Sequence, residues 1–340
     1  MVRLFHAIAN HYALQRACVY LSSVTPARAA IFVYHEVCDQ GTRRSLPAGA
    51  ALEFEKQIKY LNKACKVMPL DELTEHVLAG KTLPKRAAAI TFDDGYRDNY
   101  QYAYPVLKRY GLPATFFLAT DYIDNRKLFW WDQLSYILHK THLQVIEVGG
   151  LGNYYLRSDT ERLQAALNIT RRLKKLPDKR KNLLLESLAD ISAVEIPAGL
   201  GNEIILSWHE IREMSANGMD FGAHTLSHPI LTRVPLKAAI KEITESKRHI
   251  EEKIRKRVTT FAYPNGTPSD HNDDITEILK ESGFTFAFTS APPGMASPEA
   301  DRYHISRIPC VTEGLYLITT FFSGLAPIFF YLQKRIRKGG

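Results

Sequence analysis

The stretch ITFDDGYRDNY (residues 90–100) places two adjacent carboxylates at the end of an apolar run. Neighbouring side chains on an extended segment point in opposite directions, so Asp93 and Asp94 are expected to have different partners. One of them can bind a metal ion, while the other accepts a proton from a water that the ion makes more acidic. The alternative is that the two acids cap the helix that follows, a position that Asp favours.

A second group with ligand chemistry is HTLSH, in which His224 and His228 lie four residues apart. Four residues span about one helical turn, so both imidazoles can face one point. Pro229 disfavours helical geometry at His228, which favours a single turn or a loop. Two imidazoles and one carboxylate suit Zn²⁺ or a similar divalent ion, with positions left open for water. A chance pair on a helix surface is the alternative.

These residues need strands to bring them together, and short apolar runs alternate with helical segments along the chain. This alternation is typical of an α/β fold with a parallel sheet, and the carboxyl ends of barrel strands share one mouth. The expected strands are 29–35, 87–92, 114–119, 219–224, 259–264, 284–289 and 303–308, and the expected helices include 51–64, 102–111 and 236–256. Polar residues at or near these strand ends are therefore expected to converge: His35, Asp93, Asp94, His224, Tyr263, His304 and Arg307.

Residues 125–206 interrupt the alternation and predict a mostly helical insertion, with a hairpin around GGLGN and helices near 159–174 and 178–190. The run RRLKKLPDKRK (171–181) contains seven bases and one acid. It could bind an anionic substrate or a lipid phosphate, or it could be an ordinary solvated helix face.

Both ends of the chain differ from its centre, so we expect three parts: an amphipathic helical segment at 1–28, a domain at 29–310 and an apolar helical segment with a basic tail at 311–340. Charged and polar residues interrupt the apolar stretch that an export signal would need near the N-terminus. The uncharged run 314–333 either packs on the domain or touches a membrane, with the tail on anionic headgroups. We therefore expect a cytoplasmic protein, or one peripheral to the cytoplasmic face of the inner membrane.

The net charge of +8 in 340 residues favours an anionic partner. Nucleic acid is not expected, because the bases gather in the insertion and the tail without interleaved aromatic residues. The four cysteines lie far apart with no CxxC pair, which argues against a thiolate zinc site and against a disulfide framework.

With these motifs, the chain resembles the NodB-type polysaccharide deacetylases, carbohydrate esterase family four. TFDDG (91–95) and HTLSH (224–228) match the first two family motifs in order, and GLPATFFL (111–118) and YHEV (34–37) are also similar. The resemblance covers about 29–310 without much of the insertion. It implies a distorted parallel (β/α) barrel that hydrolyses N-acetyl groups of amino sugars.

The resemblance also implies residue roles. Asp93 becomes the general base, while Asp94, His224 and His228 hold a divalent metal, Zn²⁺ first, with Co²⁺, Mn²⁺ or Ni²⁺ as alternatives. Metal-bound water would attack the acetamide carbonyl, and the ion and backbone N–H groups would stabilise the oxyanion.

The chain departs from the family pattern in two motifs. FAYPNG (261–266) keeps Tyr263 and Pro264 as candidate walls of the substrate groove, but it lacks the Arg that orients the base. Arg307 is the candidate to replace it. The late motif reads YHISRIP (303–309) instead of LxH, so His304 becomes the candidate general acid, with a structural role as the alternative.

His35 is the second candidate for the acid. Trp130 and Trp131 could stack on sugar faces, because aromatic rings offer flat apolar surfaces, although packing within the insertion is equally open.

Together these features predict a metal-dependent N-deacetylase of amino sugars, acting on a polysaccharide or a lipid-linked saccharide in exopolysaccharide or cell-envelope assembly. Two alternatives remain open at this stage. One is a hydrolase of a non-sugar C–N amide bond on the same fold, and the other is a catalytically silent glycan-binding protein.

Overall fold

The structure is a computed structural model that describes residues 29–37, 50–290 and 300–310 together with 318 and 322. The helical segment expected at 1–28, and nearly all of the segment expected at 311–340, lie outside the described residues. Among the described residues, no helix combines the length and the apolar character needed to cross a bilayer.

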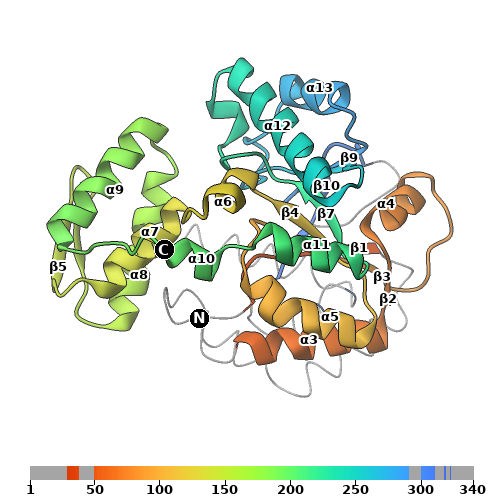
Figure 1. Cartoon of the computed structure of the whole chain (residues 1–340), viewed down its shortest axis with the longest axis horizontal. Helices are drawn as coiled ribbons and strands as arrows, with labels where there is room; N and C mark the ends of the chain where they lie inside the picture. The colour runs from red at the N-terminus through yellow and green to blue at the C-terminus, as the bar shows by residue number, and fades with distance from the viewer. Residues whose placement is uncertain (1–28, 38–49, 291–299, 311–317, 319–321, 323–340) are drawn as a thin grey trace.

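A parallel sheet of nine strands forms the centre of the domain, in the order β10-β9-β8-β7-β4-β3-β1-β11, with β2 beside β3 (Figure 1). Its apolar runs are buried on both faces, as the sequence predicts for parallel strands. The strands are β1 (Ala29–Tyr34), β2 (Lys66–Val67), β3 (Ala87–Phe92), β4 (Thr115–Leu118), β7 (Asp220–Ala223), β8 (Thr260–Ala262), β9 (Phe286–Thr289), β10 (Ile305–Ser306) and β11 (Ile308–Pro309).

One short segment closes this sheet into a nearly complete barrel. β10 pairs with β9 at one end of the strand order, and β11 pairs with β1 at the other end. Only Arg307 separates β10 from β11, so the single strand expected at 303–308 is two strands that face different neighbours. The predicted parallel (β/α) barrel is therefore confirmed, and the two ends of its sheet meet at the segment that contains Arg307.

Helices surround the strands (Figure 1) and bury the apolar stripes that their sequences carry. They are α3 (Ala50–Ala64), α4 (Leu70–Leu78), the π-helix η1 (Asn99–Ala103), α5 (Tyr104–Tyr110), α6 (Thr120–Asn125), α11 (Trp208–Ala216), the 3₁₀ turn η2 (Leu231–Arg233), α12 (Leu236–Ile254) and α13 (Asp273–Glu281). Helix α12 buries Ala239, Ile243 and Ile250 against the sheet side, which agrees with its helical period.

The residues between α6 and α11 form a helical lobe beside the barrel (Figure 1). The lobe has its own core, in which Leu134 and Leu138 pack with Ile146, Ile169 and Leu188. Its elements are α7 (Trp130–Lys140), the antiparallel hairpin β5 (Val145–Val148) and β6 (Gly152–Tyr155), α8 (Asp159–Leu173), α9 (Asp178–Ser192) and α10 (Leu200–Ile204).

Two described residues of the C-terminal segment pack into the main core. Ile318 and Phe322 are both buried, and the Phe322 ring meets Phe32 of β1 edge to face, with ring centroids 6.1 Å apart. At these two positions, the apolar character of the segment serves the packing of the domain.

Candidate metal-binding active site

Three side chains from two strand ends converge on one point. Asp94 follows β3, His224 follows β7, and His228 lies in the loop after His224. Their candidate ligand atoms all lie within 4.8 Å of one another. The Asp94 Oδ1 atom is 3.5 Å from Nε2 of His224 and 3.3 Å from Nε2 of His228. The sequence-predicted trio is thus brought together in the geometry of one ligand set.

The chemistry of this group fits a divalent cation. Asp94 Oδ1 is buried without a well-oriented hydrogen-bond donor, although the two ring nitrogens face it. The Nδ1 atom of His224 lies 2.7 Å from the carbonyl oxygen of Ala262, so a proton on Nδ1 leaves Nε2 free to act as a ligand. Orphaned buried oxygens are rare in proteins, and a cation between these atoms would satisfy all three.

The backbone at the ligands is held in unusual conformations. Asp94 has a φ of 75° and His228 has a φ of 57°, both in the left-handed region that non-glycine residues rarely adopt. Gly95 follows with a φ of 86°, where a side chain would be strained. Strain of this kind costs energy, so it persists where the surrounding structure fixes ligand positions.

The charges around the ligands favour a carboxylate ready to bind a cation. Burial raises the pKa of Asp94, but the facing imidazoles of His224 and His228 outweigh it and hold the pKa well below its ordinary value. Burial also lowers the pKa of His228, and the net shift of that imidazole is downward, towards the neutral form that a metal requires.

The neighbouring Asp93 has a different partner, as expected for adjacent side chains. Arg307 grips both of its oxygens, with Nη1 2.7 Å from Oδ1 and Nη2 2.7 Å from Oδ2. Both side chains are almost fully buried. The guanidinium is held further by the Thr91 hydroxyl at 3.2 Å and by the Thr289 carbonyl, which accepts from Nε at 3.2 Å.

This pairing sets the ionisation of Asp93. Burial alone raises its pKa, but the charge of Arg307, with smaller contributions from His224 and His35, brings the net pKa below its ordinary value. Asp93 is therefore ionised at neutral pH. Arg307 thus orients Asp93, as the sequence suggested. Asp93 does not cap a helix, because its carboxylate is bound to Arg307 inside the barrel.

The two histidines considered as general acids lie in different places. His35 is exposed at the end of β1 and lies close enough for its charge to lower the pKa of both Asp93 and Asp94. His304 is not brought to the ligand group. Its Nδ1 lies 2.8 Å from Asp301, and its ring lies 4.4 Å from that of His271.

The position of His304 follows from the turn that precedes β10. Its backbone N–H donates to the Asp301 carbonyl at 2.9 Å, and its Nε2 lies 3.5 Å from the Thr276 hydroxyl of α13, whereas Arg307 binds Asp93. The structure therefore corrects the expectation that His304 is the acid, and gives it a structural setting.

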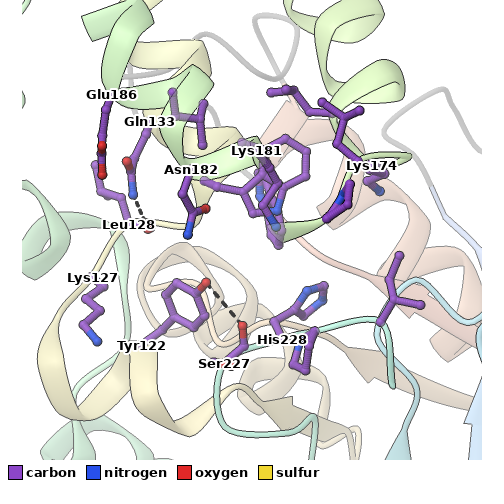
Figure 2. A pocket seen from close by; sticks show the side chains of 18 of the residues that line it. Tyr122, Lys127, Leu128, Gln133, Lys174, Lys181, Asn182, Glu186, Ser227 and His228 are labelled. Carbon is purple, nitrogen blue, oxygen red and sulfur yellow. Dashed lines mark hydrogen bonds between the residues drawn. The ribbon is translucent and has the colours of Figure 1, made fainter. Parts of the chain in front are cut away.

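A cleft of about 830 Å³ lies between the lobe and the barrel and reaches His228 (Figure 2). Trp130 and Trp131 line it, as does Tyr122. Trp131 is fixed by its indole N–H, which donates to the Tyr96 hydroxyl at 2.7 Å, and its ring lies 5.0 Å from that of His228. The two tryptophans thus lie where a sugar beside the ligand group could contact them.

Neither candidate from the third motif lines this cleft. Tyr263 is only 1% exposed, and its hydroxyl donates to the carbonyl of Tyr303 at 3.0 Å. Pro264 is buried as well. The expected groove wall at Tyr263 is thus corrected to a packing role, because this side chain alternates outward from the strand that ends at Ala262.

Two residues of the cleft were not named as site residues from the sequence, although the basic run 171–181 was considered as an anion-binding segment. Lys174 follows α8 in the basic run, and its ammonium donates to the Asn265 side chain at 2.8 Å. Asn265 lies directly after Tyr263-Pro264 with a φ of 59°. The Pro-Asn-Gly sequence signals a turn there, but nothing in the sequence shows that a lobe lysine reaches it.

The barrel places an Asp-His-His group at the carboxyl ends of its strands, and a buried, ionised carboxylate lies beside this group. This arrangement is typical of metal-dependent hydrolases. The family model described as polysaccharide deacetylase matches residues 80–287. The chain belongs to the polysaccharide deacetylase family and is a carbohydrate N-deacetylase, a hydrolase of linear amide C–N bonds.

Individual relatives agree with this assignment. The poly-β-1,6-N-acetyl-D-glucosamine N-deacetylase of Staphylococcus aureus is 24% identical over 257 residues, which cover 75% of this chain and 65% of that enzyme. The Bacillus subtilis protein YxkH, whose name also refers to polysaccharide deacetylases, is 23% identical over 290 residues, which cover 85% of this chain and 74% of YxkH.

Solved structures share the fold. The Streptococcus pyogenes deacetylase PplD superposes with a TM-score of 0.55 at 17% identity, covering 85% of this chain and 94% of PplD. IcaB from Ammonifex degensii superposes with a TM-score of 0.55 at 16% identity, covering 88% of this chain and 98% of IcaB.

Proposed function

We propose that this protein removes N-acetyl groups from the amino sugars of a glycan, either a polymer or a lipid-linked oligosaccharide, in exopolysaccharide or cell-envelope assembly. The observation that carries the proposal is the division between two adjacent acids. Asp94 faces His224 and His228, while Asp93 is ionised and held by Arg307 beside them. The name of the staphylococcal relative supports a sugar amide over a non-sugar amide.

A divalent cation, Zn²⁺ first, is proposed as the cofactor of Asp94, His224 and His228. When bound, such an ion acidifies water and polarises a carbonyl. The donor set of one carboxylate and two imidazoles suits Zn²⁺ and also Co²⁺, Mn²⁺ or Ni²⁺.

Asp93 is proposed as the general base. It accepts a proton from the water that attacks the acetamide carbon, which gives a tetrahedral intermediate. Arg307 holds both oxygens of Asp93 in place, and the lowered pKa keeps the carboxylate in its proton-accepting form at neutral pH. The C–N bond then breaks as the amine nitrogen takes up a proton, and the products are acetate and the free amino sugar.

His35 is proposed as the donor of that second proton. It is exposed at the end of β1, the strand next to β3, and its charge acts on Asp93 and Asp94. His304 lies among Asp301, Thr276 and His271 instead.

Acetate release from a β-1,6-linked N-acetylglucosamine oligomer by the Zn²⁺-reconstituted protein tests the proposal. Asp93→Asn should lower kcat by about 10²–10⁴-fold, the usual contribution of a general base, while zinc content stays the same. His35→Gln should lower kcat, and His304→Gln should leave it unchanged. Full turnover by Asp93→Asn would contradict its role as the base, and an absence of acetate release from the parent protein would support the silent-protein alternative.

A further inference from the structure

The cleft beside the ligand group is strongly basic. Its described lining includes five lysines and arginines and a single acid, Glu186. The five are Lys127, Lys174, Lys175, Lys181 and Arg233. Lys127 forms an ion pair with Asp121 at 3.0 Å, and Lys181 also has interaction partners of its own. Such an excess of positive charge in a concave site does not attract a neutral sugar polymer, but it does attract an anionic ligand.

Lys174 brings this charge close to the site of reaction. Its ammonium donates to Asn265 at 2.8 Å, and the Arg233 guanidinium donates to the Lys174 backbone carbonyl. These contacts tie the end of α8 to the barrel loops that follow β7 and β8. Among the described residues, neither Lys174 nor Arg233 forms an ion pair with a carboxylate.

The surroundings of Lys174 leave its charge only partly compensated. Lys174 lines the cleft, and burial lowers the pKa of its ammonium more than the charges of Asp94 and Asp270 raise it. A bound anion would supply the missing counter-charge at a place next to the metal ligands.

Lys181 adds a cation beside an aromatic surface. Its ammonium lies 5.2 Å from the centre of the Trp130 ring, and Trp130 meets Trp131 edge to face at 5.4 Å. In Figure 2, Lys174 and Lys181 lie on the lobe side of the cleft, across from His228 and Ser227. Aromatic faces suit sugar rings, so the cleft combines a surface for a saccharide with cations for its charged groups.

We propose that the cleft binds an oxyanion, a phosphate or a carboxylate, that the glycan carries next to the N-acetylated sugar. The substrate class would then be an acidic amino-sugar glycan, with Lys174 and Lys181 as residues that determine specificity. This inference rests on the proposed deacetylase function for the identity of the reacting sugar, but the preference for an anion can be measured by binding alone.

Binding of matched probes to the zinc-loaded Asp93→Asn protein tests the proposal by calorimetry. One pair is a tetrasaccharide of alternating glucuronate and N-acetylglucosamine and its carboxyl-reduced, uncharged form. The second pair is N-acetylglucosamine 1-phosphate and the methyl glycoside of N-acetylglucosamine. We expect the anionic member of at least one pair to bind about tenfold more tightly, the equivalent of one charge-assisted contact. The responding pair shows whether the anion is a carboxylate or a phosphate.

Charge-removing variants locate the effect. Lys174→Gln with Lys181→Gln should bring the ratio of the two affinities in the responding pair to about one, because the charged contact is lost. Any weakening from the lost contacts with Asn265 and Trp130 should affect both members of the pair alike. Lys237→Gln, which changes an exposed lysine on α12, is the matched control and should keep the preference. Raising the salt concentration should weaken the preference in the parent protein alone.

Two outcomes overturn the proposal: equal affinity within both probe pairs, or a preference that survives in the Lys174→Gln, Lys181→Gln protein. Acetate release by the parent enzyme separates the two proposals. Release from neutral oligomers without any anion preference would leave the deacetylase function intact and remove this inference. A preference for anions without acetate release from any probe would support this inference and contradict the deacetylase function.

Discussion

At the scale of single residues, the orientation of the base depends on geometry rather than on a motif position. Arg307 reaches Asp93 from the segment that closes the barrel, and its planar guanidinium matches both carboxylate oxygens. FAYPNG can therefore lack an arginine without leaving Asp93 uncompensated. The pair is buried, so each member depends on the other.

Removing one member should cost more than removing both. Arg307→Met leaves the Asp93 charge buried without a partner, and we expect the free energy of unfolding to fall by about 3–5 kcal/mol. Asp93→Asn combined with Arg307→Met should recover part of that loss, because no charge remains buried. Urea denaturation of the two variants and the parent measures this. A double variant that is no more stable than Arg307→Met would contradict the interpretation.

A metal at Asp94, His224 and His228 should stabilise the folded chain. At a free Zn²⁺ concentration of about 1,000 Kd, binding to the folded state alone contributes about 4 kcal/mol. A chelator should therefore lower the Tm of the zinc-loaded protein, as measured by differential scanning calorimetry. His228→Ala should show a smaller shift or none, whereas an equal shift in that variant would place the zinc elsewhere.

At the scale of elements, helix α11 connects the lobe to the loop after β3. Ser207 and Glu210 form a capping box at its first turn. Glu210 also accepts from Arg97 Nε at 2.7 Å, and Arg97 lies three residues after Asp94. The start of α11 thus helps to hold the segment that carries the metal ligand.

This connection should depend on pH. Burial raises the pKa of Glu210, but hydrogen bonds from Ser207 and the charge of Arg97 outweigh it, so the net pKa is lowered. A carboxyl group with a lowered folded-state pKa contributes stability fully above its unfolded pKa, about 4.3, and loses it as the pH falls through the folded value. Glu210→Gln should therefore lower the free energy of unfolding by about 1–2 kcal/mol at pH 7.

Denaturation of the parent and Glu210→Gln across the range from neutral to acid checks this expectation. The difference between them should begin to shrink only below about pH 4.3, where the carboxyl of the unfolded chain takes up its proton, and should shrink until the pH reaches the lower folded-state pKa. A difference that is constant down to pH 3 would show that the charge of Glu210 has no part in the stability.

The sequence predicted these elements well where one pattern decides the outcome. The apolar runs gave the main strands, and the helical period gave α12, because burial on one or both faces imposes those patterns. The two-residue strand β2 was missed, since Lys66–Val67 is too short to carry a period. The split of the last strand was also missed, because its two halves differ only in which neighbour they pair with.

The site residues also divide into those that the sequence predicts and those that it does not. Asp94, His224 and His228 were predictable because motif spacing and strand ends both place them, and Arg307 followed as the available cation. The orientation of Tyr263 depends on the phase of alternation at a strand end, where a shift of one residue reverses the face. The orientation of His304 depends on the turn before β10. Lys174 depends on how the lobe packs on the barrel, which no local pattern encodes.

At the scale of the whole molecule, the C-terminal segment remains a proposal for membrane contact. Its residues Ile318 and Phe322 belong to the core, so deleting the segment would disturb folding as well as any contact. Changing the four bases at 334–338 to glutamine avoids this problem. We expect the parent to sediment with vesicles containing anionic lipid and the variant to sediment less, by about 1 kcal/mol per removed charge.

Vesicles of neutral lipid are the control for that measurement, and neither protein should bind them more than the other. Equal sedimentation of parent and variant with anionic vesicles would remove the proposed contact through the tail.

The closing segment at 305–309 also has a consequence for the order in which a ribosome makes the chain. Arg307 is synthesised 214 residues after Asp93, and the same few residues supply the last pairings of the sheet. Until they emerge, the nascent chain has its metal ligands but neither a closed barrel nor a partner for its base. A premature stop codon shortly before 305 would therefore yield a protein that carries both family motifs and no deacetylase activity.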